Sequence, residues 1–296
     1  MTPEPLIHWP QPIFEFIEFA CAFLAAGAVG FRFAVVGRSR RPGAPATDGV
    51  VYDGALRRAA WIGLAGALYG AYHVWSALPR MAERQHKTVG ELLTTAPPAI
   101  TMVTLAALAV IGFALALARP RLGWPLAAIG VIAGSLRGLF FGQFAQVVKP
   151  AHMLAGGLWI GTLFIRLAAG LPAVWRWAEP RERRGLLAAD MVLAFSPMAL
   201  IMGGLLATMG VVLVFRELDR IDQLWTTPYG LALLCKLAVV AVVFGLGAWN
   251  WKRLKPRLGD EAAAVTLRGS ATRELLAALL VIVITAILVS LPSPKG

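Results

Sequence analysis

Residues 97–118 read PPAITMVTLAALAVIGFALALA, and no side chain in this stretch carries a charge. The hydrocarbon core of a bilayer is about 30 Å thick, and an α-helix needs about 20 mainly apolar residues to cross it. Residues 97–118 are therefore predicted to form a transmembrane helix. Seven other segments have the same character: 13–36, 59–78, 123–145, 148–171, 186–214, 228–250 and 271–291. The sequence thus predicts an all-α, polytopic membrane bundle of eight transmembrane helices.

The eight segments are expected to form two halves of a single membrane domain, residues 1–147 and residues 148–296, with four helices each. Only Gln146–Pro150 separates the fourth segment from the fifth. Pro150 is expected to break the helix there, because proline lacks the backbone donor and clashes with the preceding turn.

An internal repeat is one interpretation of the first and fifth segments. Parallel repeats of four helices would place matching residues at equal spacing, although chance explains the match about as well. The matching positions are Glu18, Gly27 and Arg32 in the first segment and His152, Gly161 and Arg166 in the fifth.

The composition also indicates a chain whose solvent is largely lipid. Apolar residues make up 58% of the 296 residues and charged residues 15%, whereas a soluble domain carries about 25% charged residues. The two cysteines, Cys21 and Cys235, lie in apolar runs, which excludes a disulfide framework and a Cys-x-x-Cys site. The net charge of +12 resides in short loops, so we expect the lipid bilayer as partner and no nucleic acid.

The loop charges predict the orientation of the bundle. Cytoplasmic loops are enriched in Lys and Arg. The loops on the side of the membrane that the chain reaches after the first helix contain far more Lys and Arg than those on the opposite side. The opposite side holds only Arg80, Arg84, Lys87, Lys149, Arg216, Arg220 and Lys295. Residues 1–12 contain no Lys or Arg, which argues against a cleavable signal peptide. We therefore expect a multi-pass protein of a bacterial inner membrane with both termini on the outer, periplasmic side.

All four histidines fall in the outer part of this topology. His8 lies in the outer tail and His86 in an outer loop, where both could be simply solvated. His73 and His152 lie inside the second and fifth segments near their outer ends. An ionisable side chain inside a bundle is costly and usually faces a functional interior, although a neutral histidine bonded to a neighbouring helix is the alternative. We expect His73 and His152 to come together beneath the outer boundary.

Methionines accompany these histidines. Met102, Met153 and Met209 map to the outer third, and Met202 lies in a stripe along the sixth segment that also contains Met209. Imidazole and thioether ligands together suit copper, particularly Cu(I). The alternative is that methionine fills gaps between helices, because it is flexible and polarizable.

Two sets of residues follow for a metal site. The predicted ligands are His152, His73, Met153, Met209 and Met202.

The predicted entry or accessory residues are His8, His86, Met102 and Glu18.

Nucleotide-binding loops, nucleophile elbows and paired acid–base residues are absent from the sequence, so we expect a protein that is not an enzyme.

The fifth segment resembles a known family. Residues 151–161, AHMLAGGLWIG, are similar to the His-x(6)-Trp-x-Gly segment of the copper-resistance protein D (CopD/PcoD) family. Residues 227–230, TPYG, followed by Leu234, Cys235, Lys236, Gly247, Asn250 and Pro256, look like the most characteristic helix of that family. Arg268, Glu274 and Leu291-Pro292 fit its last helix. The resemblance covers residues 148–292, and over 1–147 it rests on helix number and topology alone.

The resemblance implies an inner-membrane protein that takes copper, as Cu(I) or Cu(II), from the periplasm to the cytoplasm, often beside a small periplasmic carrier of the CopC type. It makes His152 a metal ligand by position, and Trp159, Lys236 and Asn250 motif residues without an assigned role. Two alternatives stay open. His73 and His152 could ligate a b-type haem for electron transfer, or the protein could deliver copper to a partner without translocating it.

Overall fold

The computed structural model describes residues 8–40, 45–179, 183–254 and 261–295, and all regular elements within these ranges are helices. The elements in chain order are α1 (Gln11–Gly30), η1 (Phe31–Val36), α2 (Gly37–Ser39), α3 (Ala46–Arg84), α4 (Val89–Thr95), α5 (Pro97–Ala118), α6 (Pro120–Ser135), η2 (Arg137–Phe141), α7 (Phe144–Gly156), η3 (Gly157–Gly161), α8 (Thr162–Ile165), η4 (Arg166–Gly170), α9 (Leu171–Trp177), α10 (Arg183–Glu217), α11 (Gln223–Thr226), α12 (Pro228–Leu254) and α13 (Glu261–Ser290). The element η2 is a 3₁₀-helix, and η1, η3 and η4 are π-helical.

Six of the described helices are long and apolar enough to cross a membrane. They are Gln11–Ser39, Pro97–Ala118, Phe144–Trp177, Arg183–Glu217, Pro228–Trp249 and Thr272–Ser290. The two other predicted segments are helical as well. Helix α3 is long, but its Gly, Tyr, Trp and His residues lower its hydropathy, and α6 has only 16 residues. The all-helical prediction is thus confirmed for the described part of the chain, and six of the predicted spans have the expected length and composition.

The predicted boundary between the fourth and fifth segments is wrong. Helix α6 ends at Ser135, η2 ends at Phe141 and is followed by Gly142 with a positive φ of 67°, and α7 then runs through Pro150. Glycine adopts this left-handed conformation at little cost, so it ends the helical segment. Pro150 lies only two turns into α7, where the helix tolerates the single missing hydrogen bond.

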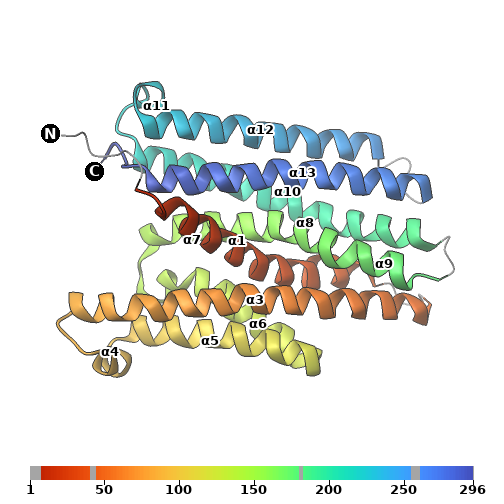
Figure 1. Ribbon diagram of the computed structural model, residues 1–296, viewed down its shortest axis with the longest axis horizontal. Coiled ribbons are helices and arrows are strands. Elements are labelled where there is room, and N and C mark those ends of the chain that lie inside the picture. The colour runs from red at the N-terminus through yellow and green to blue at the C-terminus, as the bar shows by residue number, and fades with distance from the viewer. Residues whose placement is uncertain (1–7, 41–44, 180–182, 255–260, 296) are drawn as a thin grey trace.

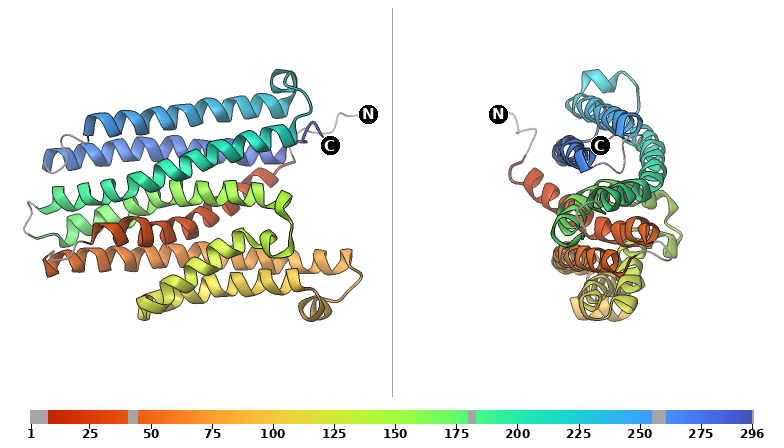
Figure 2. Two further views of the ribbon diagram at one scale, coloured as in Figure 1. Left: turned by 180° about the vertical axis from the view of Figure 1, so that it is seen from behind. Right: turned by 90° about the vertical axis from the view of Figure 1, so that its right-hand side faces the viewer.

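The helices lie side by side with their axes roughly along the longest dimension of the molecule (Figure 1). Helix α1 lies between α3 and the continuous α7–α9 helix, and packs against both. The α5–α6 hairpin covers α3 on one flank, whereas α12 and α13 pair on the other (Figure 2). Helix α1 begins and α13 ends at the same end of the bundle, where α4 and α11 also lie. Following the predicted orientation, we call this the outer end and the opposite one the inner end.

Small residues hold the centre of the bundle together. Helix α1 crosses the α7–α9 helix at Gly27 and Gly161, so closely that a Cβ on Gly161 would stand 2.0 Å from the carbonyl oxygen of Phe23. The hydroxyl of Thr162, which is buried, donates to the carbonyl of Gly27 at 3.3 Å. Glycines allow such close approach between membrane helices, where van der Waals packing drives association.

Large apolar side chains fill the space around this crossing. Phe31, Phe113, Trp124 and Met191 are almost fully buried, and Phe113 meets Trp124 edge to face at 5.9 Å between ring centroids. Apolar side chains on the outside of α10 are exposed by contrast, including Leu200 at 80%. An apolar surface of this kind is suited to contact with lipid.

An ion pair joins two helices at the inner end. The carboxylate of Asp48, at the start of α3, accepts two hydrogen bonds from the guanidinium of Arg183, at the start of α10. The Asp48 side chain is only 7% exposed. Because a bidentate pair fixes both position and angle, it sets the register of α10 against α3.

Candidate functional site

Polar side chains gather at one depth near the outer end. Glu18, His152 and Lys236 each lie about two helical turns after the start of their helices, α1, α7 and α12, and Met209 lies about two turns before the end of α10. His73 lies about three turns before the end of the longer α3. A common depth puts groups from five helices within one layer of the bundle.

His73 faces α1 rather than a second histidine. Its Nε2 atom lies 3.2 Å from a carboxylate oxygen of Glu18, and both side chains are somewhat less than half exposed. Glu15, one turn earlier on α1, lies close enough to interact electrostatically with Glu18, His73 and Lys149. The α1–α3 interface therefore presents one imidazole and two carboxylates near the outer end.

His152 of α7 faces α10. A Cβ on Gly210 would lie 3.6 Å from Cε1 of the imidazole, and the backbone of Leu206 is also close to the ring. The Nδ1 atom of His152 is buried and has no hydrogen-bond partner among the described residues. A buried polar nitrogen without a partner is costly, so this atom is suited to bind a ligand that is not part of the chain.

A positive charge stands beside this imidazole. Lys236 on α12 interacts electrostatically with His152 and with Lys149, which lies on α7. Because like charges repel strongly in a poorly hydrated interior, Lys236 opposes the binding of a cation at His152.

The structure does not bring His73 and His152 into one contact. Helix α1 lies between α3 and α7, and within the described ranges those two helices share no packed interface. His73 turns to α1, whereas His152 turns to α10. The described residues also contain no group of three or more His, Cys, Asp or Glu side chains placed to hold a metal ion. The haem alternative, which needs both imidazoles on one ring, gains no support.

The predicted methionine ligands separate in the same way. Met153 packs against Phe19, Phe23 and Ile282, in a cluster formed by α1 and α13. Met202 and Met209 are partly buried on α10 and flank Leu206 at spacings of four and three residues. Residues at such spacings share one helix face, so both thioethers lie on the face of α10 that is turned toward His152 of α7.

The predicted accessory residues lie farther out. His8 is exposed ahead of α1, and His86 is exposed in the turn after α3 with a φ of 53°. Met102 packs with Met81 in a small cluster formed by α3, α4 and α5. Within this group, Glu18 contacts another predicted site residue, His73.

The structure shows where the residues of the family-like motifs lie but does not assign a chemical role to them. Trp159 stacks at a tilt on Phe244 of α12, with 4.9 Å between ring centroids. Lys236 lies beside His152, as described above. Asn250 lies on α12, and its side chain lies outside the described part of the structure.

The sequence reasoning missed Arg166 as a buried charge. Its side chain is almost fully buried in η4, its guanidinium lies 4.9 Å from the ring centroid of Phe195, and its Nε has no partner among the described residues. Glu274 on α13 lies close enough to interact with it electrostatically. The sequence feature that could have revealed this buried charge is the position of Arg166 in an apolar run, five residues after Gly161. Arg32, its counterpart in the possible repeat, likewise lies in a π-helical turn, η1.

Fold and site together define a polytopic helical membrane protein with histidine, carboxylate and thioether groups near one end of its bundle. A family model described as copper resistance protein D matches residues 189–288. The chain thus carries a copper resistance protein D domain over this range, which confirms the predicted resemblance there. A search of curated proteins and of solved structures finds no match for the chain. Lys236 lies within the matched range, whereas His152 and Trp159 precede it.

Proposed function

We propose that this protein binds copper near the outer end of an eight-helix bundle in the bacterial inner membrane and transfers it from the periplasm toward the cytoplasm. One observation carries the proposal. The unpartnered Nδ1 of His152 is buried against a part of the chain that matches the copper resistance family, because Leu206, Gly210 and Lys236 all lie within residues 189–288.

The proposed topology adds α3 and the α6–η2 segment to the six helices that meet the length and composition of a span. Both termini then lie on the periplasmic side. The arginine-rich inner end faces the cytoplasm, in agreement with the enrichment of positive charge there.

The proposed ligands at the buried position are His152 and the thioethers of Met209 and Met202. Imidazole and thioether donors favour Cu(I) over zinc, magnesium and calcium. Lys236 weakens the binding, which suits a site that must release its ion. Conduction requires binding that is strong enough to admit an ion and weak enough to let it go.

The proposed entry position is the Glu18–His73 pair. Its imidazole and carboxylate are partly exposed near the outer end, where a periplasmic carrier of the CopC type would deliver copper. Met153, which packs among apolar side chains, is proposed as a further ligand. His8, His86 and Met102 are proposed only to collect copper at the mouth.

Competition with a chromophoric Cu(I) chelator tests the ligand assignment in detergent-purified protein under reductant. We expect His152→Ala to lose Cu(I) binding by a factor of about 100 or more, since disturbing even the groups that orient a ligand costs about 10- to 100-fold. Gln146→Ala is the matched control, because it changes an exposed polar side chain on the same helix outside the proposed sites, and it should bind as the unchanged protein does. Equal affinity of the two variants would reject His152 as a ligand.

Copper flux into proteoliposomes tests translocation separately. The unchanged protein should carry copper inward and His152→Ala should not. Copper binding without flux would instead establish the alternative in which the protein delivers copper to a partner.

A further inference from the structure

A pocket at the inner end lies between α3 and α9, far along the bundle from the histidines. Its volume is about 690 Å³, and its lining includes Arg57, Arg58 and Arg176 with Trp61 and Trp177. Three arginines therefore line one hollow. No role in copper binding accounts for them.

The described residues of the chain do not neutralise the arginines of this pocket. Asp53 is the carboxylate in the lining, and it pairs with Arg40. Within the part of the chain that the structure describes, Arg57, Arg58 and Arg176 form no ion pair with a carboxylate. Among the described residues, the positive charge of the pocket is thus not compensated.

Trp177 holds two of these arginines in place. The guanidinium of Arg58 lies 5.0 Å and that of Arg176 5.7 Å from the centroid of its ring. The ring itself fits against the backbone of α3, because a Cβ on Gly54 would stand 2.1 Å from a Trp177 carbon atom. Cations held over an aromatic face keep their position, so the two charges are fixed before any ligand arrives.

The surroundings of the pocket change from charged to apolar along α3. Arg57 and Arg58 are followed one turn later by Trp61, which is 57% exposed, and then by the apolar part of the helix. Arginine above an exposed tryptophan is the arrangement found where membrane helices pass from headgroups into hydrocarbon. In the proposed topology, the pocket therefore lies at headgroup level.

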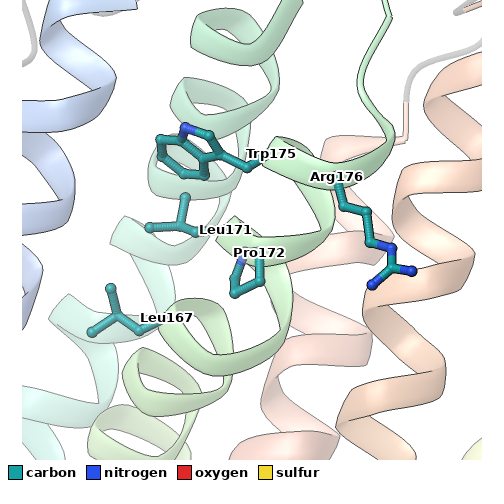
Figure 3. A pocket seen from close by; sticks show the side chains of 5 residues that line it. All are labelled: Leu167, Leu171, Pro172, Trp175 and Arg176. Atoms are coloured by element: carbon teal, nitrogen blue, oxygen red, sulfur yellow. The ribbon is translucent and has the colours of Figure 1, made fainter.

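Helix α9 separates this pocket from an apolar one. Figure 3 shows Leu167, Leu171 and Trp175 pointing to one side of the α8–α9 helix, whereas Arg176 points to the other. The second pocket, of about 370 Å³, is lined by these side chains with Pro172 and Arg176. Arg176 is part of both linings, whereas Arg57 and Arg58 belong to the pocket between α3 and α9, so that pocket carries more positive charge and is the one suited to an anion.

We infer that the pocket between α3 and α9 binds the phosphate headgroup of an anionic phospholipid. Basic pockets between membrane helices on the cytoplasmic side recognise such headgroups, and guanidinium groups match the oxygen geometry of phosphate. Arg58 and Arg176 would contact the phosphate, and Trp61 would lie against the glycerol and upper acyl region. The lipid would fasten α9 to α3 at the inner end.

Titration of phosphatidylglycerol into delipidated protein in a zwitterionic detergent tests the inference, with the rise in melting temperature as the readout. The unchanged protein should be stabilised by phosphatidylglycerol and not by phosphatidylcholine. The lipid affinity should fall about fivefold for Arg58→Gln or Arg176→Gln alone and about 25-fold for both. Arg121→Gln removes an exposed arginine at the same end, outside the pocket lining, and should leave the affinity unchanged.

Three outcomes would overturn the inference. They are equal stabilisation by both lipids, an equal loss with Arg121→Gln, or the full effect from inorganic phosphate alone, which would indicate a site for free anions. Trp177→Phe is a further variant that keeps an aromatic ring against Gly54 and should keep most of the lipid response. Copper binding by the arginine variants is expected to be normal, so the lipid site and the proposed copper function fail independently.

Discussion

Replacing Gly161 by alanine should force apart the two helices that cross at the centre of the bundle. The new Cβ would stand 2.0 Å from the carbonyl oxygen of Phe23, whereas ordinary contacts begin at 3.4 Å. The backbones must therefore separate by about 1.4 Å, because neither partner at this contact is a side chain that could rotate away.

The energetic cost of this change has three parts. Overpacking costs about 1–3 kcal/mol, and the hydrogen bond from Thr162 to Gly27 across the same crossing contributes about 1 kcal/mol that is lost. The higher helix propensity of alanine returns about 1 kcal/mol. The variant should thus be less stable than the unchanged protein by about 1–3 kcal/mol.

Unfolding in mixed micelles of a mild detergent and dodecyl sulfate measures this difference. Gly204→Ala is the matched control on α10, because a Cβ there would meet nothing within 4 Å. This control should be neutral or up to about 1 kcal/mol more stable, from helix propensity alone. If the two variants proved equally stable, the close crossing of α1 and the α7–α9 helix would be refuted.

Three further predictions concern charged groups. Asp48→Asn should destabilise the protein by about 2 kcal/mol in the same assay. This loss is smaller than that from breaking a fully buried ion pair, because Arg183 is 29% exposed. An unchanged stability would contradict the proposed role of the Asp48–Arg183 pair. The backbone N–H of Thr88, and to a lesser extent its hydroxyl, donate to the Glu91 carboxylate and hold the pKa of Glu91 below its usual range. The stabilisation of α4 by this cap is therefore fully present above the ordinary glutamate pKa and is lost as the pH falls through the lowered pKa of Glu91. Carboxyl-carbon NMR should give a Glu91 midpoint that rises in Thr88→Ala, and an unmoved midpoint would argue against the cap. Lys236→Gln should tighten Cu(I) binding by roughly tenfold, because it removes a positive charge beside the proposed site; weaker binding would instead make Lys236 part of the site's support.

The helices were largely predictable from the sequence, and their ends were not. Hydropathy located the membrane segments, because twenty apolar residues in a row admit few other structures. The break between the fourth and fifth segments was assigned to Pro150, yet it falls at Gly142. A proline early in a helix and a glycine in a left-handed turn look alike in sequence, since both interrupt an apolar run.

The depth of the polar groups was predictable, but their directions were not. Position along each helix put His73 and His152 near the outer end. Which neighbour each imidazole meets depends on the rotation of the helix and on the packing order, in which α1 lies between α3 and α7. The contact of His73 with Glu18 therefore follows from the packing of α1 and could not be read from spacing. Arg166 shows the same limit, because its burial depends on helices that are distant in sequence.

X-ray absorption at the copper edge of Cu(I)-loaded protein tests the central claim most directly, because it identifies the donor atoms. The account predicts nitrogen and sulfur neighbours around copper, with the imidazole signal lost in His152→Ala and the sulfur signal reduced in Met209→Leu. A copper environment of oxygen and nitrogen alone, or one that neither substitution changes, would contradict it.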